Sequence, residues 1–252
     1  MIPVRIIPCL DIDNSRVVKG VGFKNIKEVG EPVKLARKYQ KQKADELVFL
    51  DIGAGYKKRN ILNDIVEEIS KNIFIPFTVG GGIKNIKDIR RIIKAGADKV
   101  SICSAAIDNP EIISQAAAAF GSQCVVISID AKLDRKKDTF VCYKKGGREK
   151  TDIKAVDFAE FIEKKGAGEI LLNSIDNDGT KKGYNLKLIN KVKEKVNIPV
   201  ISSGGAGKID DIITAYKNTG SKAFLLASLL HRDKKSIKDI KKELKKKGVP
   251  VR

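Results

Sequence analysis

The sequence has little of what marks membrane, secreted or nucleic-acid-binding proteins. Its 252 residues contain no apolar run of eighteen or more, so no membrane-spanning helix is expected. The first residues, MIPVRIIPCLDID, lack the pattern of a signal peptide, and we expect a cytoplasmic protein. Aromatic residues make up 6% of the chain and no RNA- or DNA-binding motif is visible, so bases would find few stacking partners.

Cysteine is also scarce, with four residues: Cys9, Cys103, Cys124 and Cys142. None shows a metal-type spacing such as CxxC. Each lies in or beside an apolar, strand-like run, which favours buried free thiols. We therefore expect neither a metal nor a cofactor.

Basic residues, by contrast, are in large excess: 50 Lys and Arg face 31 Asp and Glu, a formal net charge of +19. Such a surface attracts phosphate groups. The lysines are nevertheless spread over every expected helix, and in KKSIKDIKKELKKK they surround a narrow stripe of Ile237, Ile240 and Leu244. We interpret them as solvated helix faces and expect no nucleic-acid partner. Phosphorylated small molecules or an acidic protein surface remain open as partners.

Strand-like apolar runs alternate with amphipathic stretches such as PVKLARKYQKQ and AVDFAEFIEKKG from end to end. Short connections favour parallel strands joined by helical crossovers. At this length a closed (β/α)8 barrel fits better than an open doubly wound sheet, and we expect one domain over residues 1–252. The eight expected strands span residues 5–10, 47–52, 74–79, 99–102, 124–129, 169–173, 200–203 and 222–226.

Residues of matching type recur about half a chain apart. This recurrence predicts an internal half-barrel duplication, with repeats of about residues 1–123 and 124–252. A site in one half would then have a counterpart in the other. The matched pairs are Asp11 and Asp130, Glu46 and Glu169, Gly81 and Gly204 or Gly205, and Ser104 and Ser228.

Two glycine turns, Gly80-Gly81-Gly82 and Gly204-Gly205, follow the third and seventh expected strands. Glycine lets backbone N–H groups approach an anion, and the next helix start adds the positive end of its dipole. Ser104 or Ser228 stands after the next strand in each half. Tight turns need glycine for their own geometry, but the symmetric occurrence favours two phosphate sites and a ligand with two phosphates.

Carboxylates close several of the expected strands. Asp11 and Asp130 end the first and fifth, so both should stand at the same rim between the two anion sites, where they suit general acid–base chemistry. The alternative is that they bond loop backbone N–H groups. Lys19, in the loop RVVKGVGF, either covers a bound phosphate or is simply solvated. Further acids that could position substrate are Asp51, Asp176 and Asp178.

Four charged residues stand at the opposite ends of the strands: Arg5, Glu46, Lys99 and Glu169. Pointing inward, they would form a ring of alternating charge at the bottom of the barrel. Buried charges are costly unless paired, so such a ring would satisfy itself or line a passage. The alternative places these side chains outward, against helices.

Several long motifs together resemble the cyclase subunit family of imidazole glycerol phosphate synthase, HisF, over residues 5–252. They include RIIPCLDI, ADELVFLDI, IPFTVGGGIK, FGSQCVVISIDAK, KKGAGEILLNSIDNDGTKKGY and ISSGGAGK. The resemblance implies a half-barrel-duplicated (β/α)8 lyase of histidine biosynthesis, in a heterodimer with a HisH-type glutaminase that supplies ammonia. The implied substrate is the bisphosphorylated ribulosyl-formimino aminoimidazole carboxamide nucleotide. The implied products are imidazole glycerol phosphate and the aminoimidazole carboxamide ribonucleotide.

Residue by residue, the resemblance implies that Asp11 and Asp130 are the catalytic pair and that Asp98 lies on the face that meets the glutaminase. The implied ammonia gate consists of Arg5, Glu46, Lys99 and Glu169. The implied phosphate and substrate ligands are Lys19, Gly82, Cys103, Ser104, Asp178, Gly179, Gly204, Gly205, Ala227 and Ser228.

The chain departs from the family pattern at a few positions that bear on how substrate is held. Gly53 and Gly55 stand in DIGAG where the family commonly has the hydroxyl residues of DITAS. Cys103 replaces an asparagine that usually contacts the ligand, and Ser128 replaces a small apolar residue beside the core passage.

Three rival functions are less consistent with the same motifs. A paralogous subunit that channels ammonia to a sugar amidotransferase, making an acetamidino sugar, is disfavoured by retention of Asp11. The sister barrel isomerase shares the phosphate sites, but GSQC, GAGEILLNS, SSGGAGK and the charged ring favour the cyclase. A non-catalytic nucleotide- or RNA-binding protein would present a continuous basic groove rather than scattered lysines.

Overall fold

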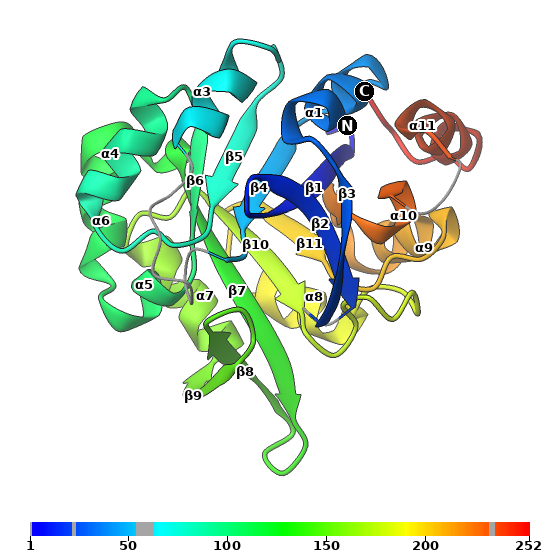
Figure 1. The fold of residues 1–252 in the computed structure, drawn as a ribbon. Helices are drawn as coiled ribbons and strands as arrows, with labels where there is room; N and C mark the ends of the chain where they lie inside the picture. Colours follow the sequence, from blue (N-terminus) through cyan, green and yellow to red (C-terminus); the bar gives the residue numbers. More distant parts are fainter. Residues whose placement is uncertain (1, 22–23, 54–62, 232–234) are drawn as a thin grey trace.

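Eight parallel strands close into a barrel in a computed structural model that describes residues 2–21, 24–53, 63–231 and 235–252 (Figure 1). Each strand pairs with its neighbours in order, and pairings of β7 with β10 and of β12 with β1 complete the circle. The expected (β/α)8 barrel is thus confirmed. Its strands are β1 (Arg5–Asp13), β4 (Leu47–Asp51), β5 (Phe77–Gly80), β6 (Lys99–Ile102), β7 (Val125–Asp134), β10 (Glu169–Ser174), β11 (Val200–Ser203) and β12 (Ala223–Leu226).

The barrel strands are apolar on both faces because each face meets a different core. Along β1, Ile6 and Leu10 belong to the large cluster between strands and helices, whereas Ile7 and Cys9 belong to a smaller cluster inside the barrel. Successive side chains of a strand point to opposite faces, which produces this division. Val48, Val126, Leu171, Ile201 and Leu225 complete most of the interior cluster.

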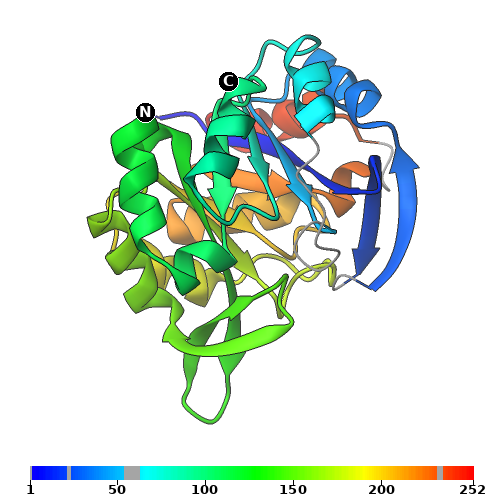
Figure 2. The same cartoon turned by 60° about the vertical axis from the view of Figure 1, so that its left-hand side comes forward.

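Helices surround the barrel and bury one apolar face each (Figure 2). In α4, Ile89 and Ile92 are fully buried, and the helix begins at Asn85, whose side chain accepts from two backbone N–H groups; such caps contribute about 1 kcal/mol. The longer helices are α1 (Pro32–Lys41), α3 (Asn63–Ser70), α4 (Ile86–Lys94), α6 (Glu111–Phe120), α7 (Ala155–Lys164), α8 (Leu186–Lys193), α9 (Ile209–Thr219) and α11 (Ile237–Lys246). Shorter turns are α5 (Ser104–Asp108), η1 (Ser122–Cys124) and α10 (Ser228–His231).

Two antiparallel hairpins that the sequence did not predict extend the barrel. β2 (Arg16–Val21) and β3 (Lys24–Gly30) continue from β1, and β8 (Thr139–Lys144) and β9 (Glu149–Lys154) continue from β7 (Figure 1). The loop prediction for RVVKGVGF is therefore wrong over Arg16–Val21, whereas residues 22 and 23 lie outside the described part of the chain. The turn that joins β1 to β2 explains why the chain folds back here. Asn14 and Ser15 both have positive φ, as a two-residue hairpin turn requires.

Some strand boundaries also differ from the prediction. The third barrel strand begins at Phe77 and not at residue 74, because Phe74 is 88% exposed and precedes the paired segment. β1 and β7 run on to Asp13 and Asp134, since their last residues pair with the hairpins. The internal duplication stays a prediction. Within the described residues, no helix is long and apolar enough to cross a membrane.

Candidate active site

The inward side chains of β1 show how the barrel interior is layered. Period-two alternation places Arg5, Ile7, Cys9 and Asp11 on one face, from the N-terminal to the C-terminal end of the strand. Parallel neighbours repeat the order, so the interior has three layers. We call the rim at the N-terminal strand ends the base and the rim at the C-terminal ends the mouth. Charged groups lie at the base, apolar ones in the middle and carboxylates at the mouth.

Four alternating charges meet at the base. The Arg5 guanidinium lies 2.5 Å from Glu46 Oε1 and 2.5 Å from Glu169 Oε1. Lys99 Nζ lies 3.0 Å from Glu46 Oε2 and 2.9 Å from Glu169 Oε2. Each cation therefore contacts both acids, and we call these four residues the charged ring. The inward arrangement is the one found, and the alternative of outward contacts with helices is wrong.

Mutual pairing keeps the ring charged despite its burial. Burial alone would raise the pKa of Glu46, but the charges of Arg5 and Lys99 outweigh it and hold that pKa below its usual value. Burial alone would lower the pKa of Lys99, yet the Glu169 and Glu46 carboxylates raise it above its usual value. Neither group gains by neutralising, so the ring stays charged at the base.

Hydroxyl groups occur among the apolar side chains above the ring. Thr78 and Ser101 alternate with outward-facing core residues, so they point inward, and both are buried. Ser101 Oγ has no hydrogen-bond partner among the described residues. Ser128, which faces Leu171 in the β7–β10 register, keeps some exposure inside the barrel. The middle layer thus offers polar contacts to a small molecule between base and mouth.

Asp130 lies buried at the mouth among neutral donors. Its Oδ1 accepts from Asn173 Nδ2 at 3.0 Å, and its Oδ2 lies 3.8 Å from Cys103 Sγ. Asn173 is in turn held by Ser203, whose Oγ donates to Asn173 Oδ1 at 3.2 Å. The strand register causes this chain of contacts, because Asn173 pairs with Asp130 on one side and with Ser203 on the other.

These surroundings perturb the protonation of Asp130. Burial raises its pKa, the Asn173 hydrogen bond opposes that rise, and the negative charge of Asp178 adds to it. Burial, followed by the Asp130 charge, also raises the pKa of the Cys103 thiol, and it raises that of Cys142 to about 12. Both thiols therefore stay neutral beside the carboxyl group. A carboxyl with a raised pKa at a barrel mouth is typical of a proton donor.

Asp11 occupies the corresponding position on β1. It is 8% exposed, pairs with Leu50 in the β1–β4 register, and its Oδ1 lies 3.6 Å from Cys9 Sγ. The prediction that Asp11 and Asp130 end their strands is wrong, because β1 and β7 continue into the hairpins. Both still lie within one residue of the last barrel pairing, so the two carboxylates share the mouth.

The glycine turns lie at the same rim, one after β5 and one after β11. Gly81, at φ 97°, could not carry a side chain, because its Cβ would lie 2.1 Å from the Asp51 carbonyl oxygen. Gly205, at φ 109°, would meet the Gly183 carbonyl oxygen at the same distance. Packing against the preceding loop therefore accounts for these two glycines without a ligand. Phosphate binding at the turns stays a prediction.

The other predicted ligands follow neighbouring strands. Cys103 and Ala227 come directly after β6 and β12, and Ser104 and Ser228 begin the short helices α5 and α10. Ser104 Oγ accepts from the Lys145 N–H group at 3.0 Å, which ties it to the β8–β9 turn. The structure thus brings together at the mouth Gly82, Cys103, Ser104, Asp178, Gly179, Gly204, Gly205, Ala227 and Ser228.

The remaining predicted positions either lie outside the described residues or have structural contacts of their own. Lys19 lies in β2, and its side chain is outside the described part of the chain, as is all of Gly55. The Gly53 N–H group donates to Asp51 Oδ1 at 3.1 Å, so that acid supports its own loop. Asp176 accepts from the Leu133 N–H group at 2.9 Å and anchors the extension of β7.

Comparison with known proteins identifies the family. Residues 5–236 match the model of the histidine biosynthesis protein family. The chain belongs to this family. Among its relatives, imidazole glycerol phosphate synthase subunit HisF of Lactococcus lactis subsp. cremoris (strain SK11) is 54% identical over 252 residues, which are 100% of this chain and 97% of the relative. The subunits of the same name from Clostridium botulinum (strain Langeland) and Hydrogenobaculum sp. (strain Y04AAS1) are 53% and 52% identical, with both chains fully covered.

In this histidine biosynthesis protein, the residues that support Asp130 were missed from the sequence. Asn173 is two residues after Leu171 and four residues after Glu169, so all three side chains lie on the same inward face of β10. That spacing was the available signal. Ser203 stands at the end of β11 and could be linked to Asn173 only through the register between strands.

Proposed function

We propose that this chain is the cyclase subunit of an imidazole glycerol phosphate synthase. It would use ammonia to convert the bisphosphorylated ribulosyl-formimino aminoimidazole carboxamide nucleotide to imidazole glycerol phosphate and the aminoimidazole carboxamide ribonucleotide. The observation that carries the proposal is one barrel interior with two carboxylates at the mouth and a closed charged ring at the base. Full-length relatives that bear the synthase name support the choice of reaction.

The substrate would lie across the mouth with one phosphate in each half. Backbone N–H groups of glycine turns and short helix starts suit phosphate oxygens. Holding both ends fixes the reacting centre between the acids and lowers the entropic part of the barrier. The residues proposed to hold it are Lys19, Gly82, Cys103, Ser104, Asp178, Gly179, Gly204, Gly205, Ala227 and Ser228.

Asp130 and Asp11 would divide the proton transfers. Ammonia attacks the ribulosyl carbonyl, and loss of water from the adduct requires a proton on the departing oxygen. The buried Asp130, whose raised pKa favours the protonated form, suits that donor role. Asp11 would accept protons from nitrogen. The same pair would then serve ring closure and cleavage, with proton donor and acceptor exchanging roles.

Ammonia would reach the mouth through the barrel interior. At the base, four ion pairs span the N-terminal end of the barrel, and one of them would open to admit a molecule. Above it, the buried hydroxyl of Ser101 offers a hydrogen bond that no described residue uses. A dry route keeps ammonia neutral, whereas water would protonate it.

The relatives are named as subunits, so a partner chain belongs to the proposal. We expect it to be a glutaminase that docks on the base and delivers ammonia to the charged ring. Phe74, 88% exposed, and Ile2, 72% exposed, precede β5 and β1 at this end. Such side chains would serve as apolar anchors for the partner. Asp98, exposed beside Lys99, would contribute to the polar rim of that interface.

The decisive experiment omits the partner. The purified chain is incubated with an ammonium salt at alkaline pH and the bisphosphorylated nucleotide, and both products are followed by chromatography. We expect conversion that depends on ammonia. Failure to convert this substrate, together with amidination of a nucleotide-activated sugar in a parallel reaction, would assign the chain to the sugar amidotransferase branch instead.

A further inference from the structure

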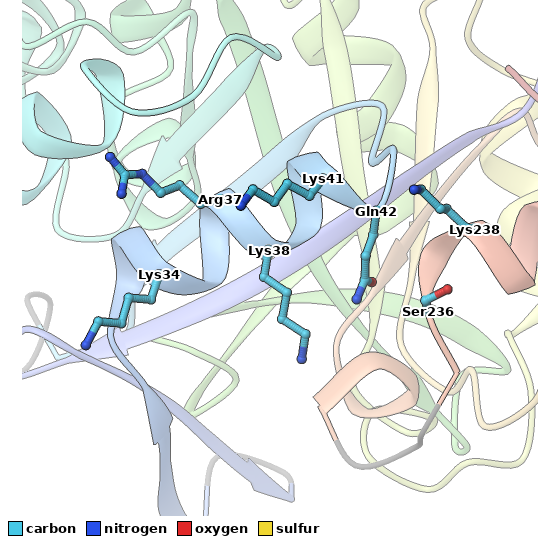
Figure 3. A pocket seen from close by; sticks show the side chains of 7 residues that line it. All are labelled: Lys34, Arg37, Lys38, Lys41, Gln42, Ser236 and Lys238. Carbon is cyan, nitrogen blue, oxygen red and sulfur yellow. The ribbon is translucent and has the colours of Figure 1, made fainter.

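A basic hollow of about 570 Å³ lies between α1 and the start of α11, in the outer layer of the barrel (Figure 3). Seven residues line it, and five of them are cations: Lys34, Arg37, Lys38, Lys41 and Lys238. The first four project from α1, and Lys238 projects from the start of α11 beside Ser236. None of the seven is acidic. Lysines that look scattered in the sequence are therefore gathered here by the fold.

The spacing along α1 concentrates this charge. Lys34, Lys38 and Lys41 recur at intervals of four and three, which places them on one face of the helix, with Arg37 beside them. Like charges at such spacings destabilise a helix. Glu31 neutralises Lys34 at 2.9 Å, and the Arg37 guanidinium contacts the Asn72 side chain. The remaining repulsion would be relieved by a bound anion.

The two helices that form the basic hollow are joined to each other and to the barrel by side-chain contacts. Gln42 Oε1 accepts from the Ile237 N–H group at 3.1 Å, which joins the end of α1 to the start of α11. One turn further on, Lys241 Nζ lies 2.8 Å from Asp45 Oδ1, and both side chains are almost completely buried. Asp45 also accepts from the Ile6 N–H group of β1 at 2.8 Å. Such preorganisation reduces the cost of binding.

The composition of the hollow selects among possible ligands. Protein interfaces are depleted of lysine and depend on apolar anchors, and none of the large exposed apolar side chains described lines the hollow. No aromatic side chain lines it to stack a base. Its volume falls in the range of small-ligand pockets, roughly 300–1,000 Å³. Arginine and lysine together are suited to phosphate oxygens.

We propose that the hollow between α1 and α11 binds a compact polyphosphate anion, such as a free diphosphate or triphosphate or the polyphosphate group of a nucleotide. This site is separate from the two phosphate positions proposed at the mouth, because α1 and α11 lie on the outer layer of the barrel.

Inorganic tripolyphosphate is the probe, titrated calorimetrically into the full-length chain. The hollow variant carries Lys38→Gln, Lys41→Gln and Lys238→Gln, and the matched control carries Lys94→Gln, Lys195→Gln and Lys217→Gln. All six lysines are exposed, so each variant removes three surface charges outside the core. We expect the hollow variant to bind one tripolyphosphate fewer per chain, or to bind it roughly tenfold or more weakly, while the control matches the wild type.

Equal binding by the wild type and the hollow variant, or an equal loss in the control, would overturn the proposal. A second measurement locates the site: tripolyphosphate should protect Lys38, Lys41 and Lys238 from acetylation, as read by mass spectrometry. Adenosine triphosphate in a third titration separates the two sources, since a nucleotide site would bind it more tightly than the inorganic anion. The hollow variant should retain wild-type ammonia-dependent activity, so this test is independent of the proposed cyclase reaction.

Discussion

The base and the mouth of the barrel accommodate buried charge in opposite ways. At the base, Glu46 and Glu169 each contact two cations, and the ionised form of Glu46 is favoured. At the mouth, Asp130 meets a neutral amide, neutral thiols and the charge of a second acid, and burial raises its pKa above the usual value. The difference indicates that the base is built to stay charged and closed, whereas the mouth is built to exchange protons.

The largest expected effect tests the mouth. Asp130→Asn and Asp11→Asn should each lower ammonia-dependent turnover by roughly 10²–10⁴-fold, the usual contribution of general acid–base catalysis. Steady-state rates of product formation provide the measurement. Asp138→Asn, which removes an exposed partner of Lys187, serves as the control and should keep wild-type rates. Near-normal turnover in either mouth variant would remove the assigned pair.

The next effect tests the base. Glu46→Gln leaves Arg5 and Lys99 with one carboxylate between them, so the free energy of unfolding should fall by about 3 kcal/mol. Urea denaturation at neutral pH measures it. Glu160→Gln, which breaks an exposed pair with Lys164, should leave stability almost unchanged. Similar losses in the two variants would contradict the argument from burial.

The pH dependence of that loss has a definite sign. The pKa of Glu46 is lowered from 4.5 in the folded chain, so its contribution to stability is present above pH 4.5 and disappears as the pH falls through the folded pKa. The difference between the wild type and Glu46→Gln should therefore shrink in acid. A difference that grows below pH 4.5 would show that the ring does not favour the ionised form.

The change in stability caused by Asp130→Asn should have the opposite sign to that caused by Glu46→Gln. Because the folded pKa of Asp130 is raised above 3.8, its ionisation costs stability, and that cost is complete only above the folded pKa. The amide still offers an oxygen to Asn173. Asp130→Asn should thus stabilise the chain at neutral pH, and the gain should vanish towards pH 3.8. Destabilisation at neutral pH would contradict the difference that we draw between the base and the mouth.

The smallest effect concerns the support of Asp130. Asn173→Ala removes a hydrogen bond that favours the ionised carboxyl, so the pKa of Asp130 should rise further. The limb of the kcat/KM profile that reports Asp130 should move to higher pH, with roughly a tenfold change or less at neutral pH. Ser203→Ala should move it less and in the same direction. A purely structural role would lower activity without moving the limb.

Much of the barrel could be predicted because its strands are covered on both faces. Apolar runs bounded by charge at one end and carboxylate at the other indicated strand order, the charged ring and the shared mouth. The hairpins could not be predicted from this pattern. β3 and β9 read KNIKEVG and EKTDIK, and such polar segments look like loops when the strand they pair with is unknown.

A site residue could be predicted where its position along a single strand was enough. It could not be predicted where its role depends on the register between strands. Asp11 and Asp130 needed only their place just after the apolar run of a barrel strand. The chain of contacts from Ser203 through Asn173 to Asp130 depends on the register of three strands. The glycines illustrate a further limit, since Gly81 and Gly205 are required by backbone packing whether or not an anion binds beside them.

The two hairpins give this molecule unpaired strand edges, which a closed barrel lacks. A closed sheet has no unpaired edge, but in the described sheet β3 pairs only with β2, and β9 pairs only with β8. Strand addition and aggregation would therefore start at these two edges. Along β9, Glu149, Lys150, Asp152 and Lys154 carry charge of both signs, which opposes a neighbouring strand. The hairpin on the β7 side is thus protected against self-association by its own sequence.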